Sequence, residues 1–411
     1  MAAGKVRGRA PMIHFFHPRL EGFIGEVMSL VSHESYARCV NELVCLDMAN
    51  SQMFVDRLSR AWDNDDAVFP LDQRLPLPAR QQILNIVKPT IMATNDGDVR
   101  VDGMPVEPGD AVVVATSGTS GTPKAAVLTM SAVEASARAT TEQLNVSLRD
   151  TWLACLPPSH VGGLSVITRS LIMGTSLIAA PSFSPETFTE AAQNGATLVS
   201  LVSTALQRVD PALYRTIVLG GSRQGSQLPP NCVTTYGMTE TGSGVVYNGK
   251  ALRGVELEIR DSIVYVKAPM LLRAYRDGSV PLDSNGWFCT NDRGSLSDDG
   301  VLQIEGRDGD LIITGGENVW PEVVEDALRN FQTVTDLCVA GVPDPEWGRA
   351  IHVWVVTTDK NEVSLDALRA HVKQTLPAHF APRQMHVISE IPRTALGKPQ
   401  RSLLVESLKS S

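Results

Sequence analysis

Residues 115–129, ATSGTSGTPKAAVLT, place six hydroxyl side chains, two glycines and one lysine within a single short stretch. Glycines allow backbone N–H groups to approach an anion, hydroxyls donate hydrogen bonds without adding charge, and a lysine supplies a positive charge. This combination is suited to a polyphosphate. The residues that we expect to bind it are Thr116, Ser117, Gly118, Thr119, Ser120, Gly121, Thr122 and Lys124.

The stretch differs from the Walker phosphate loop, which requires a glycine directly before the lysine and a hydroxyl directly after it. Here Pro123 precedes Lys124 and Ala125 follows it. A solvated Ser/Gly linker is the alternative interpretation. The apolar run at 111–116 predicts a strand before the stretch, and the pattern at 130–144 predicts a helix after it. Both favour a folded loop at the carboxyl end of a sheet.

Strand and helix patterns continue to alternate through about residue 250, which predicts a layered α/β fold. Apolar, β-branched runs that end at Gly, Pro or Ser predict buried strands at 176–181, 197–203 and 215–221. A helix is expected at 184–196, since Ser184 can cap it and Pro185 suits its first position.

The pattern changes twice after residue 250. Short strands and turns at about 250–306 predict a small β-rich subdomain, which completes a large N-terminal domain of residues 1–306. Residues 307–411 then predict a small α+β domain, with helices that begin at Pro321 and after Ser364.

Composition excludes several classes of protein. The chain has 411 residues, 43% of them hydrophobic, and a net charge of −9 with scattered Lys and Arg, which argues against nucleic-acid binding. No apolar run approaches the ~20 residues of a membrane helix, so we expect no membrane insertion. The six cysteines form no C-x-x-C pair and predict reduced thiols in the cytoplasm, with neither disulfides nor a zinc site.

The stretch at 116–124 resembles the phosphate loop of the adenylate-forming enzymes, a superfamily that includes acyl-CoA synthetases, aryl-CoA ligases, peptide-synthetase adenylation domains and luciferases. Four more segments resemble the superfamily's motifs in the same order: TTYGMTETGSG (234–244), GWFCTNDRG (286–294), GRDGDLIITGGENVWPEVVE (306–325) and PRTALGKPQR (392–401). The resemblance covers about residues 110–402. It implies a mobile C-terminal cap domain and the use of ATP, Mg²⁺ and coenzyme A.

The resemblance also implies a nucleotide site. Tyr236 would lie against the purine, Thr239 would donate to a phosphate, and Glu240 would hold Mg²⁺, which takes only one or two carboxylates beside phosphate and water. Asp292 would accept both ribose hydroxyls, and Arg307 would reach the same sugar. Further positions implied around the nucleotide are Gly220, Gly221, Ser222, Thr235, Gly237 and Met238.

Each of these residues has a structural alternative. Tyr236 could be a buried tyrosine beside a surface glutamate, Asp292 could cap a turn, and Arg307 could pair with Asp308 or Asp310.

Two steps of chemistry follow from the resemblance. Lys398 would supply the cation for carboxylate attack on the α-phosphorus of ATP. After rotation of the small domain, Gly315 and Gly316 would leave enough room for the pantetheine arm of the thiol. Many relatives carry Asp or Lys two positions after the hinge arginine, where this chain has Gly309; glycine can still absorb the backbone rotation.

The segment 153–175 resembles o-succinylbenzoate–CoA ligases in its His-x-x-Gly-Leu-Ser pattern. His160 would line the acyl and thiol tunnels, and Arg169 could bind the second carboxylate of an aromatic diacid. The alternatives are a satisfied, partly buried histidine and an arginine on a helix surface. The early position of the phosphate loop implies an abridged first subdomain, about 1–110, which also favours these ligases.

We therefore predict an ATP-dependent carboxylate–CoA ligase that acts through an acyl-adenylate on an aromatic acid such as o-succinylbenzoate. Its partners would be ATP, CoA and this small carboxylic acid. A medium-chain or other aryl-CoA synthetase, an adenylation enzyme that loads a carrier protein, and a non-catalytic nucleotide-binding protein are the alternatives. The sequence leaves a homodimer open.

Overall fold

The computed structural model describes residues 41–116, 123–220, 228–329, 331–357, 363–393 and 399–408. Their contacts divide the chain into two units. The described residues up to 220 form the first unit together with 228–255 and 268–281, and the second unit contains 256–267 and everything from 282 onward. The predicted boundary at residue 306 stays a prediction.

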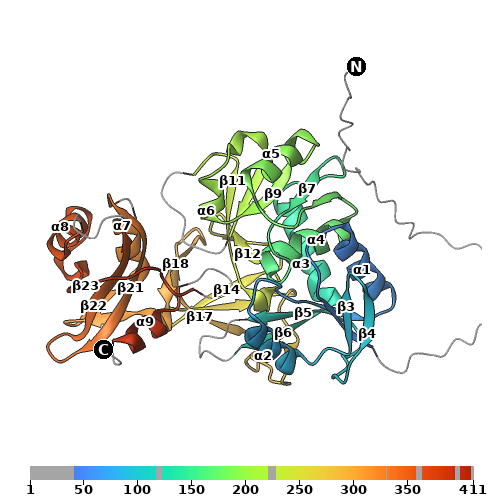
Figure 1. Ribbon diagram of the computed structural model, residues 1–411, viewed down its shortest axis with the longest axis horizontal. Coiled ribbons are helices and arrows are strands. Elements are labelled where there is room, and N and C mark those ends of the chain that lie inside the picture. Colours follow the sequence, from blue (N-terminus) through green and yellow to red (C-terminus); the bar gives the residue numbers. More distant parts are fainter. Residues whose placement is uncertain are drawn as a thin grey trace, which may run out of the picture. The chain divides into compact units, whose positions relative to one another are not determined.

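Two seven-stranded sheets form the framework of the first unit (Figure 1). The first has the order β16 (Ala274–Tyr275), β6 (Lys124–Thr129), β5 (Asp110–Thr116), β2 (Ala67–Pro70), β1 (Leu43–Leu46), β3 (Ile91–Thr94) and β4 (Gly97–Arg100). The second has the order β13 (Lys250–Ala251), β12 (Gly244–Tyr247), β11 (Cys232–Gly237), β10 (Thr216–Leu219), β9 (Leu198–Leu201), β7 (Thr151–Ala154) and β8 (Ser176–Ala179).

The central strands of both sheets are parallel and buried, as their apolar runs predict. The expected strands appear as β5, β8, β9 and β10, and the last three are one or two residues shorter at one or both ends than expected. The helix expected at 130–144 is present at Met130–Gln143, but a strand that the sequence analysis did not predict precedes it and contains Lys124. Lys124 begins this strand, β6, which pairs antiparallel with β5 in a register that aligns Thr116 with Lys124.

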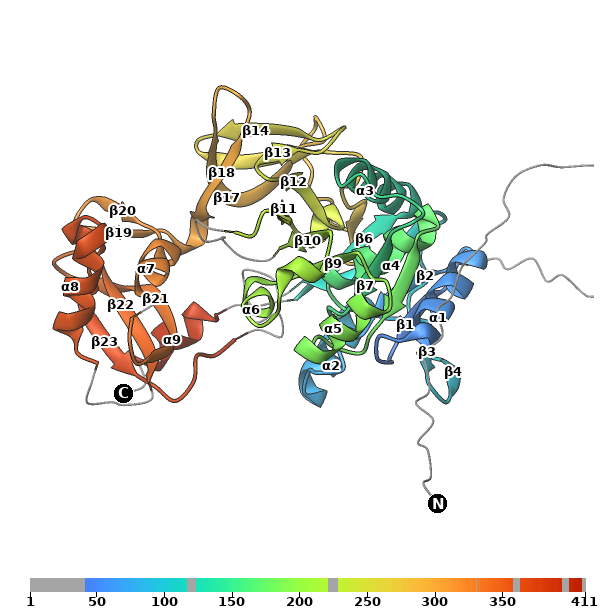
Figure 2. The ribbon, with the colours of Figure 1, turned by 90° about the horizontal axis from the view of Figure 1, so that it is seen from above.

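Helices cover the sheets of this unit: α1 (Gln52–Asp63), α2 (Leu77–Val87), α3 (Met130–Gln143), α4 (Val161–Met173), α5 (Pro185–Gln193) and α6 (Ser203–Leu206). Helix α5 begins as predicted, because the Ser184 hydroxyl accepts from the Thr187 amide and Pro185 occupies the first turn. Helices α3 and α4 lie side by side in both views (Figure 2). None of the helices in the described part of the chain is long and apolar enough to cross a bilayer.

The second unit contains two smaller sheets. One is antiparallel, in the order β14 (Glu256–Arg260), β15 (Ile263–Lys267), β17 (Phe288–Leu296) and β18 (Leu302–Arg307). The other has the order β20 (Glu317–Val319), β19 (Ile312–Thr314), β22 (Gly348–Thr357) and β21 (Val334–Asp344), with β23 (Gln384–Val387) also on β22. The helices of this unit are α7 (Pro321–Leu328), α8 (Leu365–Thr375) and α9 (Arg401–Ser407).

Side chains on β21 alternate between two cores because successive strand residues point to opposite faces. Val339 packs with apolar residues of α7 and α8, whereas Cys338 packs with Trp354 and with Leu404 of α9. Helices α7 and α8 therefore cover one face of this sheet, and α9 covers the other. Pro321 and Ser364 start α7 and α8 as the sequence predicts.

Candidate active site

Lys124 lies beside two residues that are distant in the sequence. Its Nζ atom is 4.6 Å from the centre of the Tyr275 ring, and the Tyr275 hydroxyl donates to Glu240 Oε1 over 2.9 Å. Strand β16 places Tyr275 there, since it pairs antiparallel with β6 and aligns Tyr275 with Ala126. The phosphate-loop lysine and the predicted magnesium carboxylate are thus joined through one phenol ring.

Tyr275 contacts two predicted site residues, and sequence reasoning missed it. It belongs to none of the five motifs, and a two-residue strand gives no periodic signal. Its position depends on a long-range antiparallel pair, which only the fold reveals.

Hydrogen bonds within the segment 237–243 hold the backbone around Glu240. The Met238 amide donates to the Thr241 hydroxyl over 2.9 Å, and that hydroxyl donates to the Ser243 carbonyl over 2.7 Å. A Cβ atom at Gly237 would lie 2.2 Å from the Ser243 carbonyl oxygen, so only glycine fits. Thr239 and Glu240 open the short 3₁₀ turn that follows, and Glu240 is half-buried.

The donor set suits a hard cation shared with phosphate. Glu240 supplies one carboxylate and Thr239 one hydroxyl, and Mg²⁺ bound to nucleotides takes one or two carboxylates and completes its shell with phosphate and water. Among the residues that the structure describes, no three His, Cys, Asp or Glu side chains gather as a metal cage.

The second sheet brings Gly220 and Thr235 together at the carboxyl ends of β10 and β11. The Thr235 hydroxyl donates to the Leu219 carbonyl over 3.0 Å, and a Cβ atom at Gly220 would approach that hydroxyl to 3.3 Å. Tyr236 is half-buried on β11 next to this pair. Ligands of parallel sheets bind at such ends, which agrees with the predicted adenine position.

Asp292 and Arg307 of the second unit face each other on β17 and β18, where they are register partners. Arg307 Nη1 donates to Asp292 Oδ1 over 2.9 Å. The alternative pairings foreseen for Arg307 are made by other arginines: Arg293 pairs with Asp308, and Arg401 with Asp310. The predicted ribose residues are therefore neighbours.

Gly315 and Gly316 form the two-residue turn of the β19–β20 hairpin. Both have positive φ, +60° and +84°, as tight hairpins require. A Cβ atom at Gly315 would also lie 2.9 Å from the Trp347 ring. Turn geometry explains why glycine is needed here, and the role toward a thiol stays a prediction.

His160 precedes α4 and contacts a loop that follows β2. Its Nε2 atom is 3.0 Å from Arg74 Nη2 and 3.3 Å from Asp72 Oδ2. A guanidinium can only donate, so the first contact is a hydrogen bond when Nε2 carries its lone pair, and the second when it carries a proton. Asp72 also binds Arg74 through both carboxylate oxygens, at 2.8 and 2.6 Å.

Asp72 and Arg74 come from the segment to which the sequence assigned no site. Burial opposes the charge of Asp72, but the hydrogen bonds from Arg74 and His160 outweigh it and hold its pKa well below the usual range. The Asp72 side chain is 6% exposed and that of Arg74 52%. The buried carboxylate of Asp72 thus holds the solvent-accessible guanidinium of Arg74 next to His160.

Arg169 is buried in α4, which excludes the helix-surface interpretation. Its guanidinium stacks over the Trp152 ring at 5.0 Å, and burial lowers its pKa. Its Nε and Nη1 atoms have no hydrogen-bond partner among the residues that the structure describes. The remaining predicted site residues, Ser117, Gly118, Thr119, Ser120, Gly121, Thr122, Gly221, Ser222 and Lys398, lie outside the described residues.

Comparison with known proteins agrees with this geometry. The model of the AMP-binding enzyme family matches residues 86–266, and that of the AMP-binding enzyme C-terminal domain matches 323–398. A probable 2-succinylbenzoate–CoA ligase of Mycobacterium tuberculosis is 35% identical over 364 residues, which cover 80% of this chain and 94% of the relative. The chain belongs to the AMP-binding enzyme family. The predicted superfamily, its ligase class and an enzymatic role are thereby confirmed.

Two further similarities extend the match. A 2-succinylbenzoate–CoA ligase of Listeria monocytogenes is 31% identical, over 72% of this chain and 70% of its own. The o-succinylbenzoate CoA synthetase (MenE) of Bacillus subtilis, solved with the acyl-adenylate intermediate OSB-AMP, superposes with a TM-score of 0.79 at 25% identity and covers 88% of each chain. The predicted fold class, a layered α/β domain followed by a small α+β domain, is confirmed.

Proposed function

We propose that this AMP-binding enzyme joins an aromatic diacid, 2-succinylbenzoate, to coenzyme A at the expense of ATP. The observation that carries the proposal is the match along 94% of the length of a relative named for this reaction. The Bacillus subtilis synthetase, named for the same acid, shares the fold across 88% of both chains.

The first step forms an acyl-adenylate. A carboxylate oxygen attacks the α-phosphorus of ATP, an O–P bond forms, and the bond to pyrophosphate breaks. Lys124 and the hydroxyl-rich stretch before it would bind the phosphates, while Thr239 and Glu240 would hold Mg²⁺, which neutralises phosphate charge when bound. Tyr275 supports this assignment because it fixes Glu240 beside Lys124.

Other residues would bind and orient the nucleotide and promote its attack. Tyr236 would contact the adenine, Asp292 and Arg307 the ribose, and Lys398 would stabilise the charge that develops at the α-phosphorus.

The second step exchanges AMP for sulfur. The CoA thiol gives its proton to water, its sulfur attacks the acyl carbon, and the bond between that carbon and the phosphate oxygen breaks, which releases AMP. Gly315 and Gly316 would leave room for the pantetheine arm, and His160 would line the tunnels for the acid and the thiol. These assignments follow the motif positions, and we propose them together with the cytoplasmic location and the homodimer.

The second carboxylate of the diacid has two candidate partners. Two N–H groups of Arg169 have no hydrogen-bond partner among the described residues, but the residue is only 3% exposed to solvent. Arg74 is half-exposed, is aimed by Asp72 and touches His160. Accessibility favours Arg74.

Incubation with ATP, Mg²⁺, CoA and 2-succinylbenzoate, in parallel with benzoate and hexanoate, tests the proposal. Mass spectrometry should show the diacid thioester at the highest rate, and Glu240→Gln should abolish it as a matched isosteric control. A thioester of only hexanoate or benzoate would refute the substrate. Transfer only to a phosphopantetheinyl carrier protein would refute CoA as the acceptor.

A further inference from the structure

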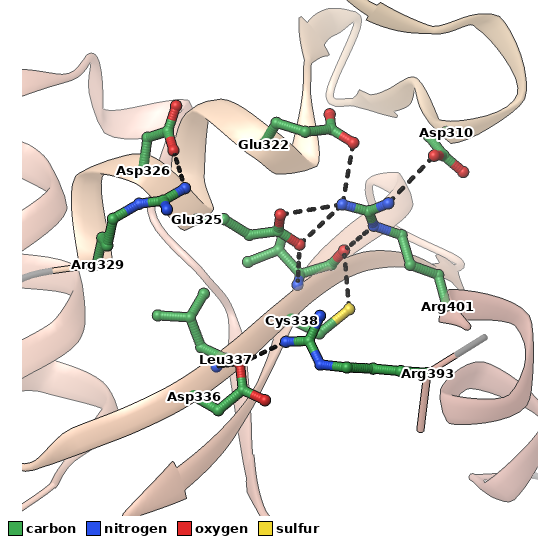
Figure 3. Close-up of polar contacts among 11 residues, drawn as sticks. Asp310, Glu322, Glu325, Asp326, Arg329, Asp336, Leu337, Cys338, Arg393 and Arg401 are labelled. Carbon is green, nitrogen blue, oxygen red and sulfur yellow. Dashed lines mark hydrogen bonds and ion pairs between the residues drawn. The ribbon is translucent and has the colours of Figure 1, made fainter. Parts of the chain in front are cut away.

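Arg401, the first residue of α9, lies at the centre of a polar cluster in the second unit (Figure 3). Its Nη2 atom is 2.9 Å from Glu325 Oε1 and 2.9 Å from Glu322 Oε1, and its Nη1 atom donates to Asp310 over 3.2 Å. The side chain is 16% exposed. One guanidinium therefore meets three carboxylates from two separate elements.

The same cluster covers the free edge of a sheet. Strand β21 is the last strand of its sheet, so alternate backbone groups point away from β22. At Val339 these groups are satisfied by the cluster: Arg401 Nε donates to the Val339 carbonyl and the Val339 amide donates to Glu325 Oε1, both over 2.9 Å. Arg401 and Glu325 thus take the place that a further strand would fill.

Burial opposes the charge on Arg401, but Glu325 and Glu322 outweigh it and raise its pKa. Arg401 therefore remains positively charged through the ordinary pH range. A planar guanidinium with five donors can satisfy this set of acceptors, whereas an ammonium group cannot match its geometry.

Arg393 holds the other end of the same segment. Its Nη2 atom donates to Asp336 Oδ1 over 2.6 Å, which ties it to β21 a few residues from Val339. Arg393 also forms an antiparallel bridge with Pro399, and the Gln400 amide donates to the Pro392 carbonyl over 2.8 Å. The described residues on either side of 394–398 are therefore paired with each other, and Arg393 is also tied to β21.

Lys398, to which the proposed function gives the first chemical step, is bonded directly to Pro399. We infer that Arg401 and Arg393 are positioning residues for adenylate formation, because they fix both ends of the segment that carries Lys398 to β21 and α7. Asp310, the residue after Gly309, also binds Arg401, so the cluster is linked to the end of the predicted hinge. This inference rests on the proposed function.

The two half-reactions separate positioning from folding. Arg401→Met, Arg401→Lys and Arg393→Met are assayed for acid-dependent pyrophosphate release without CoA, and then for thioester formation from preformed acyl-adenylate and CoA. Displacement of a reacting group by ~1 Å costs about a hundredfold in rate. We expect about that loss of the first half-reaction in Arg401→Met, a smaller loss in Arg401→Lys, and less than threefold change in the second half-reaction.

Arg329→Met is the matched control, because Arg329 pairs with Asp326 on the exposed side of α7, outside the cluster (Figure 3). It should change neither half-reaction. Arg401→Met leaves three carboxylates without their cation, so Arg401→Met/Glu325→Gln is made as well to relieve their repulsion. We expect the double variant to recover thermal stability but not pyrophosphate release.

Equal losses in both half-reactions, or recovery of pyrophosphate release together with stability, would overturn the inference. Unchanged first half-reactions in both Arg401→Met and Arg393→Met would overturn it too. A wild-type enzyme that releases no pyrophosphate with any acid would instead refute the proposed function, on which the inference depends.

Discussion

Asp72→Asn tests whether the N-terminal segment holds His160 in place. The substitution keeps one carbonyl oxygen, which can still accept from the Arg74 amide at 3.0 Å and from Nε at 2.8 Å. The second oxygen becomes an NH₂ group, which faces the donor Arg74 Nη2, now 2.6 Å from Oδ2. Arg74 thereby loses the contact that aims Nη2 at His160.

The size of the effect follows from burial. A hydrogen bond between charged groups contributes ~1.5–3 kcal/mol. Asp72 is 6% exposed but Arg74 is 52% exposed, so solvent screening places the expected loss of folding free energy at about 1–2 kcal/mol. If a similar free energy is lost from substrate positioning, kcat/KM for the diacid falls about tenfold, since ~1.4 kcal/mol corresponds to a factor of ten.

Scanning calorimetry measures the stability, pyrophosphate release measures kcat/KM, and ¹⁵N NMR of the His160 ring reports its tautomer in both proteins. Asp98→Asn is the control, because the Asp98–Arg57 pair lies on the surface of the same unit, with Asp98 48% exposed, and should contribute less than ~1 kcal/mol. Equal effects of Asp98→Asn and Asp72→Asn, or an unchanged tautomer and kcat/KM in Asp72→Asn, would refute the reasoning.

Four further predictions concern single residues. Arg169→Met should leave stability unchanged or raise it by about 1 kcal/mol, because it removes buried N–H groups that lack a partner in the described structure while keeping the contact with Trp152; a loss above ~2 kcal/mol in urea unfolding would contradict this. Gly309→Ala should stabilise by ~0.4–1 kcal/mol, because no atom lies within 4 Å of its Cβ and its φ is not positive. Gly306→Ala should destabilise the protein, since its Cβ would lie 2.5 Å from a tryptophan ring. A melting temperature of Gly306→Ala above that of Gly309→Ala would contradict these two predictions. Burial lowers the pKa of His352 from 6.5 to about 4, so the folded state binds fewer protons between these values; stability is complete above pH 6.5, falls by roughly 1–3 kcal/mol toward pH 4, and should fall less in His352→Asn.

Local signals were sufficient for much of the framework. Ser184 and Pro185 start α5, Ser364 caps α8, and the apolar runs became buried parallel strands, because caps and hydrophobic periodicity act within a few residues. Strand β6 was missed: KAAVLT is short and follows a proline, and its strand state depends on pairing with β5 and β16.

The candidate site also contains residues that the sequence could predict and residues that it could not. Motif positions predicted Glu240, Asp292 and Arg307 as site residues, and the structure shows that the last two are neighbours. Tyr275, Asp72 and Arg74 could not be found from the sequence, because their proximity to Lys124 and His160 arises from contacts over 86 residues or more. Arg169 could not be recognised as buried, since its charge suggested a surface position that the packing of α4 overrides.

The central claim is that the enzyme cleaves ATP at the α-phosphorus to activate a carboxylate. Incubation with ATP, Mg²⁺ and 2-succinylbenzoate in the absence of any thiol tests it most directly, with mass spectrometry of the enzyme-bound product and quantification of the released phosphate species. We predict one equivalent of pyrophosphate and an acyl-adenylate of the diacid for each active site. Release of ADP and inorganic phosphate, or the absence of any adenylate while ATP binds, would contradict the account.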